Sequence, residues 1–177
     1  MNKPFGNIRS LTLSAMLTAI SVVIGIFCKN FLNFGGGLFR VTFENLPILL
    51  SGILFGPLAG GLVGAASDLI SYMLSSQIYP PNLIVTAGAV AVGVVSGAVA
   101  RLCRKKGERT RIILSCSAAH LIGSMIIKPI GLYQFYGALV LWRIPLYLVI
   151  APVEIFIICL LYKKSAIKKL FTKEQTK

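Results

Sequence analysis

Acidic residues are scarce in this chain. It contains five Asp and Glu against 18 Lys and Arg, and charged residues make up 13% of its 177 positions. A soluble domain usually carries about 25% charged residues. Here 56% of the residues are hydrophobic and the mean hydropathy is +0.83. We therefore expect one membrane-embedded domain over residues 1–177, without room for a second globular domain.

Residue types that support catalysis or metal binding are also few. The chain has one histidine, His120, and its four cysteines show no CxxC spacing, so the sequence predicts neither a metal site nor a disulfide framework. It contains no phosphate-binding loop and no nucleophile elbow. We expect a protein that is not an enzyme and that needs no cofactor.

Basic residues gather in two short stretches, 101–111 (RLCRKKGERTR) and 163–177. Nucleic-acid surfaces usually combine such patches with soluble folds and aromatic platforms, and neither is visible here. The runs are instead typical of the cytoplasmic side of a membrane protein. The sequence therefore predicts that this chain lies in a lipid bilayer. It predicts no nucleic-acid partner.

Apolar runs separated by turn residues predict an all-α membrane protein, a compact bundle of six transmembrane helices. The run from Leu11 to Cys28 has no convincing cleavage site, so we interpret it as a retained helix. As one helix, Leu46–Leu74 would be about 43 Å long against a hydrocarbon core of about 30 Å, so Gly56-Pro57 is expected to divide it. The helices are predicted at about 8–29, 44–55, 58–75, 83–101, 111–128 and 143–162, with a loop over Lys128 to Arg143.

The distribution of charge predicts that both termini are cytoplasmic. Six helices place 14 of the 18 basic residues on the cytoplasmic side and four outside. Five helices with the N-terminus outside give the same count, so helix length and Pro57, rather than charge, favour six. We expect a multi-pass protein of the bacterial cell membrane.

Polar and aromatic residues gather at the outer ends of the predicted helices. Asp68 lies in lipid-compatible sequence, where a charged side chain costs about 2.5–3.5 kcal/mol and so usually faces a cavity, a partner or a ligand. A structural ion pair of Asp68 and an interfacial belt of aromatic residues are the alternatives. Glu154 lies in mid-helix, and its face is left open. Convergent charges and rings suit a small, flat, partly charged molecule, and the candidate binding residues are Phe34, Arg40, Glu44, Asp68, Asn82, Lys128, Tyr133, Trp142 and Arg143.

Small residues recur at intervals of four in three series. Gly52, Gly56, Gly60 and Gly64 form one series, and Ala89, Gly93 and Gly97 form another that predicts packing within the bundle. Ala15 and Ala19 form a third, on the first helix. Such pairs let helix backbones approach closely. From the residues alone, Ala15 and Ala19 fit either internal packing or docking of another membrane protein.

The stretch from Phe39 to Tyr72, followed by Tyr79-Pro80-Pro81-Asn82, resembles the substrate-binding S component of energy-coupling factor (ECF) transporters, and most of all the folate-type member. Its LPI–G–FGP–G element is shared widely among S components, so it indicates the class better than the vitamin. The resemblance implies a subunit that captures a vitamin outside and works with a transmembrane T component and two cytosolic ATPases. It implies that the surface of Ala15 and Ala19 contacts the T component.

Folate chemistry suits these residues. A pterin edge offers an amine and a ring N–H that the Asp68 carboxylate could accept together. The ring could stack on Trp142, Phe34 or a tyrosine, and the anionic glutamate tail would prefer Arg40, Lys128 or Arg143. The alternatives are an S component for another vitamin, such as pantothenate, and a stand-alone secondary carrier. Such carriers commonly show repeats with paired broken helices, and here only Gly56-Pro57 forms a break.

Overall fold

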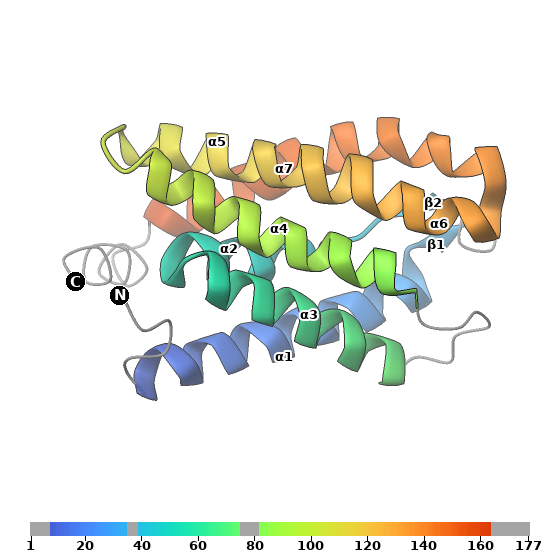
Figure 1. Ribbon diagram of the computed structural model, residues 1–177, viewed down its shortest axis with the longest axis horizontal. Helices are drawn as coiled ribbons and strands as arrows, with labels where there is room; N and C mark the ends of the chain where they lie inside the picture. The colour runs from blue at the N-terminus through green and yellow to red at the C-terminus, as the bar shows by residue number, and fades with distance from the viewer. Residues whose placement is uncertain (1–7, 35–38, 75–81, 164–177) are drawn as a thin grey trace.

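The computed structural model describes residues 8–34, 39–74 and 82–163, and these form a helical bundle (Figure 1). Five of its described helical stretches are long and apolar enough to cross a membrane, and a sixth, α2, is shorter. The prediction of an all-α bundle of six membrane helices is confirmed. The elements are α1 (Ile8–Phe31), β1 (Asn33–Phe34), β2 (Phe39–Arg40), α2 (Asn45–Phe55), α3 (Pro57–Leu74), α4 (Leu83–Leu102), α5 (Glu108–Ala119), the π-helix η1 (His120–Ile127), α6 (Lys128–Tyr136), the 3₁₀-helix η2 (Gly137–Trp142) and α7 (Arg143–Lys163).

The helices run back and forth between two ends of the molecule. The start of α1, the α2–α3 junction, the α4–α5 connection and the end of α7 lie at the left of Figure 1. The short antiparallel pairing of β1 with β2, together with α6, lies at the opposite end. We call the left end the basic end, because it carries the run 101–111, and the other the β1–β2 end.

The junction of α2 and α3 forms where the sequence predicts it. α2 ends at Phe55, and Gly56 adopts a φ of 95°, a left-handed conformation that glycine tolerates best. Pro57 is the first residue of α3, where its missing N–H would have no helical partner anyway. The Gly56-Pro57 pair therefore turns the chain without leaving a long loop at the membrane surface.

The predicted loop over Lys128 to Arg143 is wrong. The chain continues from α5 through η1 into α6 as one helical stretch, and only then turns through η2 into α7. Pro129 follows directly on η1, at the start of α6, and the helical stretch continues through it although proline offers no backbone N–H. Gly137, with a φ of 57°, ends the stretch instead.

Glycines bring α3 and α4 into backbone contact. A Cβ atom added at Gly93 of α4 would overlap the carbonyl oxygen of Gly60 in α3, and one added at Gly64 would overlap that of Ala89. A Cβ atom at Gly97 would overlap the backbone of Pro57. The two small-residue series therefore pack against each other, which confirms the predicted packing of the second series within the bundle.

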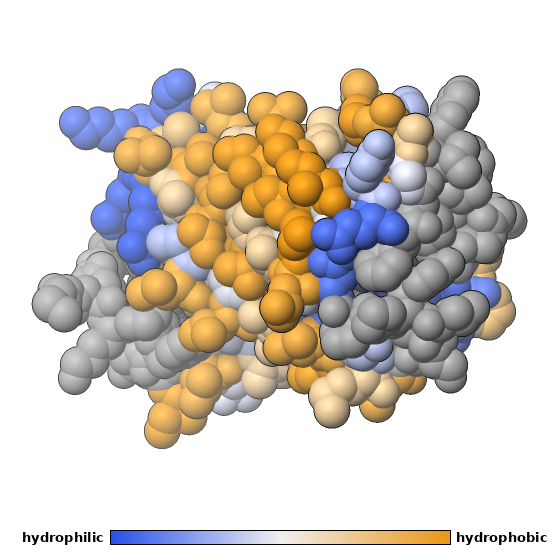
Figure 2. Space-filling view, turned by 45° about the vertical axis from the view of Figure 1, so that its right-hand side comes forward, coloured by the Kyte–Doolittle hydropathy of each residue, from blue (hydrophilic) through white to orange (hydrophobic). Residues whose placement is uncertain are grey.

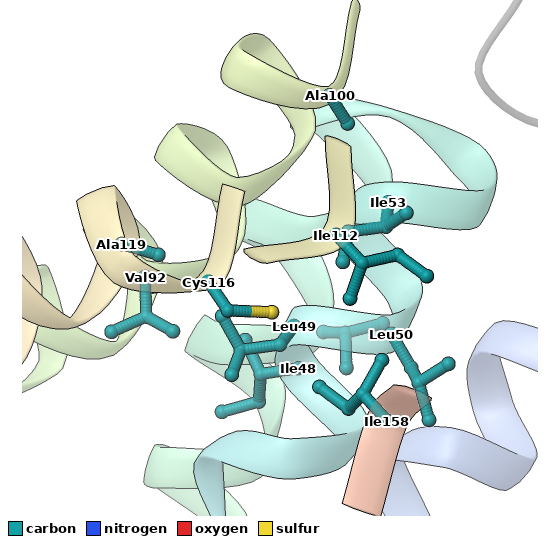
Figure 3. Packing of buried hydrophobic residues seen from close by; sticks show 11 residues of the cluster. Ile48, Leu49, Leu50, Ile53, Val92, Ala100, Ile112, Cys116, Ala119 and Ile158 are labelled. Carbon is teal, nitrogen blue, oxygen red and sulfur yellow. The ribbon is translucent and has the colours of Figure 1, made fainter. Parts of the chain in front are cut away.

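The core lies around α2, which other helices surround. Figure 3 shows Ile48, Leu49 and Ile53 of α2 beside Ile112 and Cys116 of α5. Val92 of α4 and Ile158 of α7 complete the cluster, and both are fully buried. A short central helix thus serves as the common packing partner of α4, α5 and α7.

The outer surface suits a lipid environment. Figure 2 shows hydrophobic side chains over much of the visible face, with hydrophilic ones at its left, the basic end, and in a patch to the right of its middle. Large apolar side chains are exposed on every long helix, among them Met16, Leu62, Leu121 and Phe156. Because contiguous apolar patches are rare on soluble monomers, this surface matches the predicted membrane location.

Candidate functional site: a buried polar cluster toward the β1–β2 end

The start of α2 is drawn into the bundle by the segment that follows β2. The backbone N–H of Val41 donates to the Leu32 carbonyl at 3.2 Å, and the buried Thr42 hydroxyl lies 3.3 Å from the Tyr147 hydroxyl of α7. The Ser21 hydroxyl of α1 donates to the Glu44 carbonyl at 2.7 Å. These contacts on both sides place Glu44 and Asn45 among the helices rather than in an external loop.

Lys128 reaches this start of α2 from α6. Its ammonium donates to Asn45 Oδ1 at 2.9 Å and lies 3.6 Å from Glu44 Oε1. The Lys128 side chain is 6% exposed and that of Glu44 18%. A buried charge needs a partner of opposite sign and hydrogen bonds, and Lys128 has both here. Two predicted binding residues, Glu44 and Lys128, are therefore brought together.

Glycines leave room for these two side chains. A Cβ atom added at Gly88 of α4 would come within 2.6 Å of Lys128 Cγ, so the lysine stem fills the notch at this glycine. A Cβ atom at Gly25 of α1 would come within 3.0 Å of Glu44 Oε2 and 3.2 Å of the Ser71 hydroxyl. The cluster of Glu44, Asn45 and Lys128 is thus walled by the backbones of α1 and α4.

Asp68 and Asn82 lie on the α3 and α4 side of the bundle. The Thr86 hydroxyl of α4 donates to Asp68 Oδ2 at 2.7 Å. Asn82 caps α4, because its Oδ1 accepts from the Ile84 N–H at 2.9 Å, and its amide donates to the Gly131 carbonyl of α6. Asn82 therefore ties the start of α4 to α6, and a role in binding substrate stays a prediction.

The remaining candidates are placed less fully. Tyr133 of α6 is 59% exposed. Phe34, Arg40, Trp142 and Arg143 belong to β1, β2, η2 and α7, so their backbones lie at the β1–β2 end, but their side chains are outside what the structure describes. Their roles in ring stacking and in binding an anionic tail stay predictions.

Two features of the interior were not settled by the sequence. Asn45 was not among the candidate binding residues, although it is fully buried and receives the Lys128 hydrogen bond. Glu154 faces the interior of the bundle, where Oε2 lies 2.8 Å from His120 Nε2. The available signal was the spacing of His120, Ser124 and Lys128, three polar residues four apart in an apolar segment.

Ala15 and Ala19 lie on the exposed face of α1. The same helix turns Ser10, Ser14 and Ser21 into the bundle, where all three are buried. The alanine pair is therefore not packed inside this chain, which leaves the surface open to a partner helix. Docking of a T component on it stays a prediction.

Residues 9–173 match the family described as the substrate-specific component of ECF transporters. The chain belongs to this family. S components are transport subunits that bind a vitamin and pair with a T component and ATPases, and they are not enzymes. This S component is accordingly a multi-pass membrane protein.

Similar proteins include a folate transporter, FolT, of Clostridium novyi (strain NT), which is 29% identical over 122 residues, 67% of each chain. An uncharacterised protein of Mycoplasma pneumoniae is 30% identical over 105 residues, which span 54% of this S component and only 21% of that protein. The crystal structure of FolT bound with folic acid has the same fold, with a TM-score of 0.66 at 23% identity over 88% of this chain and 92% of the other.

Proposed function

We propose that this S component captures folate outside a bacterial cell and delivers it inward together with a T component and two cytosolic ATPases. The observation that carries the proposal is the buried cluster of Glu44, Asn45 and Lys128, which brings hydrogen-bond acceptors and donors together inside the bundle. The 29% identity to a folate transporter supports the choice of vitamin.

The polar groups match the edge of a pterin ring. The ring presents an amine and an N–H as donors, for which the Asp68 and Glu44 carboxylates are acceptors. It also presents a carbonyl oxygen, for which the Lys128 ammonium is a donor. Because Lys128 is almost wholly buried beside Asn45, we now assign it to the ring rather than to the flexible glutamate tail.

The anionic tail is assigned to Arg40 and Arg143, whose backbones lie at the β1–β2 end. Arginine binds carboxylates through two parallel hydrogen bonds, which suits a glutamate. Phe34, Tyr133 and Trp142 remain the proposed aromatic contacts of the ring system. In this proposal the β1–β2 end faces outward, and the basic end, with the start of α1 and the end of α7, faces the cytoplasm.

Calorimetry on the purified chain in detergent tests the choice of ligand. We expect one folate per monomer to bind without ATP, and free pterin to bind more weakly because it lacks the tail. Riboflavin, biotin and pantothenate are measured in the same way as comparison ligands. Binding of one of these without folate binding would show an S component for a different vitamin.

Reconstitution tests the mode of transport. Liposomes that contain only this chain should not accumulate labelled folate, because the S component is expected to need the T component and the ATPases. Uptake by the chain alone in ATP-free liposomes would support a stand-alone secondary carrier instead. Liposomes with the complete complex and internal ATP provide the positive control.

A further inference from the structure

His120 and Glu154 form a buried pair to which the proposed folate contacts assign no role. His120 Nε2 lies 2.8 Å from Glu154 Oε2, and the two side chains are 1% and 0% exposed. The other ring nitrogen, Nδ1, lies 3.3 Å from the hydroxyl of Ser124, which is fully buried. Both nitrogens thus have a polar neighbour, and together these neighbours fix the imidazole orientation. The pair joins η1 to α7.

The pair lies at the start of the π-helix that leads to Lys128. The Lys128 N–H donates to the Gly123 carbonyl, five residues back, instead of the four of an α-helix. A return of η1 to α-helical bonding would rotate every later residue by about 100° relative to α5. That rotation would turn the Lys128 ammonium away from Asn45. The position of Lys128 therefore depends on the register of η1.

Contacts on two sides hold this register. Toward α4, a Cβ atom added at Gly123 would overlap the Val92 side chain, so η1 packs there without a gap. Toward α7, the His120–Glu154 pair fixes the first residue of η1. The side chains of Leu121, Ile122 and Ile126 are exposed on the outer surface. Rotation of η1 would move its polar side chains, those of His120 and Ser124, toward lipid, which offers them no hydrogen-bond partner.

We propose that His120, Ser124 and Glu154 are positioning residues, which hold η1 in the register that brings the Lys128 ammonium to Asn45 and Glu44. The inference rests on the proposed function, in which Lys128 contacts the folate ring. None of the three residues touches the substrate. They act through the backbone of η1, in which Lys128 follows His120 by eight positions, and Glu154 holds η1 from α7.

A double-mutant cycle on folate affinity tests this inference. His120→Gln and Glu154→Gln should each weaken folate binding on the order of tenfold, and so should Lys128→Met. In the Lys128→Met background, His120→Gln should change the affinity less than about twofold, because there is no ammonium left to position. The exchanged pair, His120→Glu with Glu154→His, should restore most of the affinity.

Ser115→Ala is the matched control. Ser115 lies on the same helical stretch, is fully buried, and donates to the Arg111 carbonyl at 2.7 Å. Loss of the Ser115 hydroxyl should leave folate affinity unchanged, both in the native chain and in the Lys128→Met background. The inference is overturned if His120→Gln weakens binding equally with and without Lys128. It is also overturned if His120→Gln and Glu154→Gln lower only the melting temperature and leave affinity intact.

A ligand-free measurement separates this inference from the choice of vitamin. Lys128→Cys, in a chain whose four native cysteines are replaced by serine or alanine, is labelled with a water-soluble maleimide in detergent. Adding Glu154→Gln should change the labelling rate several-fold, because η1 is then no longer held in one register and the exposure of the cysteine changes. Adding Ser115→Ala should not change the rate. Equal rates would overturn the inference even if folate binds. If folate fails to bind but the rates differ, only the proposed function falls.

Discussion

At the scale of residues, the ion pair of Lys128 and Glu44 is expected to stabilise the candidate site. Lys128→Met removes the ammonium that lies 3.6 Å from the Glu44 carboxylate, whose side chain is 18% exposed. Breaking a buried pair costs about 3–5 kcal/mol, and the partial exposure of Glu44 favours the lower end. We expect a clearly lower melting temperature in ligand-free detergent samples.

The double variant Glu44→Gln with Lys128→Met is the control for that loss. Because neither charge remains buried, it should recover much of the stability that Lys128→Met removes. Thermal melts of the three variants measure this directly. A double variant as unstable as the sum of both single changes would mean that the two side chains do not stabilise each other.

Asp68 provides the residue-scale test of the substrate contacts. Asp68→Asn replaces a second acceptor oxygen with a donor that the pterin amine cannot use. A hydrogen bond to a charged group contributes about 1.5–3 kcal/mol, so affinity should fall on the order of ten- to a hundredfold. Free pterin should lose about as much as folate, since the contact lies on the ring. Calorimetry with both ligands measures the two losses.

Thr86→Val separates binding by Asp68 from its structural hydrogen bond. This change removes the hydroxyl that donates to Asp68 at 2.7 Å but keeps the carboxylate. It should lower the melting temperature slightly, and the Asp68 carboxylate should still accept hydrogen bonds from the ligand. If Asp68→Asn lowers only the melting temperature and keeps full affinity, Asp68 serves the contact between α3 and α4 alone.

At the scale of elements, the contact of α3 with α4 depends on glycine. A Cβ atom at Gly93 would overlap the Gly60 carbonyl, and backbone atoms move less easily than a side chain. Gly93→Ala should therefore destabilise the bundle by about 1–3 kcal/mol. Gly107→Ser is the control, because a Cβ atom there meets nothing within 4 Å and serine suits the first position before α5. Melting temperatures that fall equally in both variants would contradict this account of the packing.

The sequence predicts elements best where the signal is local. Gly56-Pro57 ends α2 because glycine can adopt the left-handed conformation and proline suits the start of α3. The same local reading failed at Lys128 to Arg143, where Pro129 and Gly131 look like helix breakers. There the helical stretch continues through Pro129, which follows directly on the π-helix η1, and Gly131 packs against Ile84 of α4.

Pairings between distant helices could not be read from the sequence. Glu154 and His120 are 34 positions apart in the chain, and only the packing of α7 against η1 brings them together. Likewise, Lys128 and Glu44 were both predicted as binding residues, but their contact depends on how α2 begins inside the bundle. Residue types alone suggest a chemistry for the candidate site, whereas tertiary packing determines which groups meet.

At the scale of the whole molecule, two surfaces are separated along the bundle. The polar cluster lies toward the β1–β2 end, between α1, α2, α4 and α6, whereas Ala15 and Ala19 lie on the exposed face of α1. α1 spans both regions, because Ser21 and Gly25 contact the Glu44 region from its later turns. A change at the alanine surface is therefore expected to affect assembly without reaching the ligand.

Ala15→Leu and Ala19→Leu test this separation. A branched side chain on this face would hold α1 away from a partner helix that needs close contact. We expect assembly with the T component, and folate uptake in cells, to be lost, while folate affinity of the purified chain changes less than about twofold. Ala87→Leu is the matched control, since Ala87 is an exposed alanine on α4, and it should leave both assembly and binding intact. Pull-down of the T component and calorimetry on the same variants distinguish the outcomes. If affinity falls while assembly survives, α1 transmits the change inward to Ser21 and Gly25, and the exposed alanine face has no docking role.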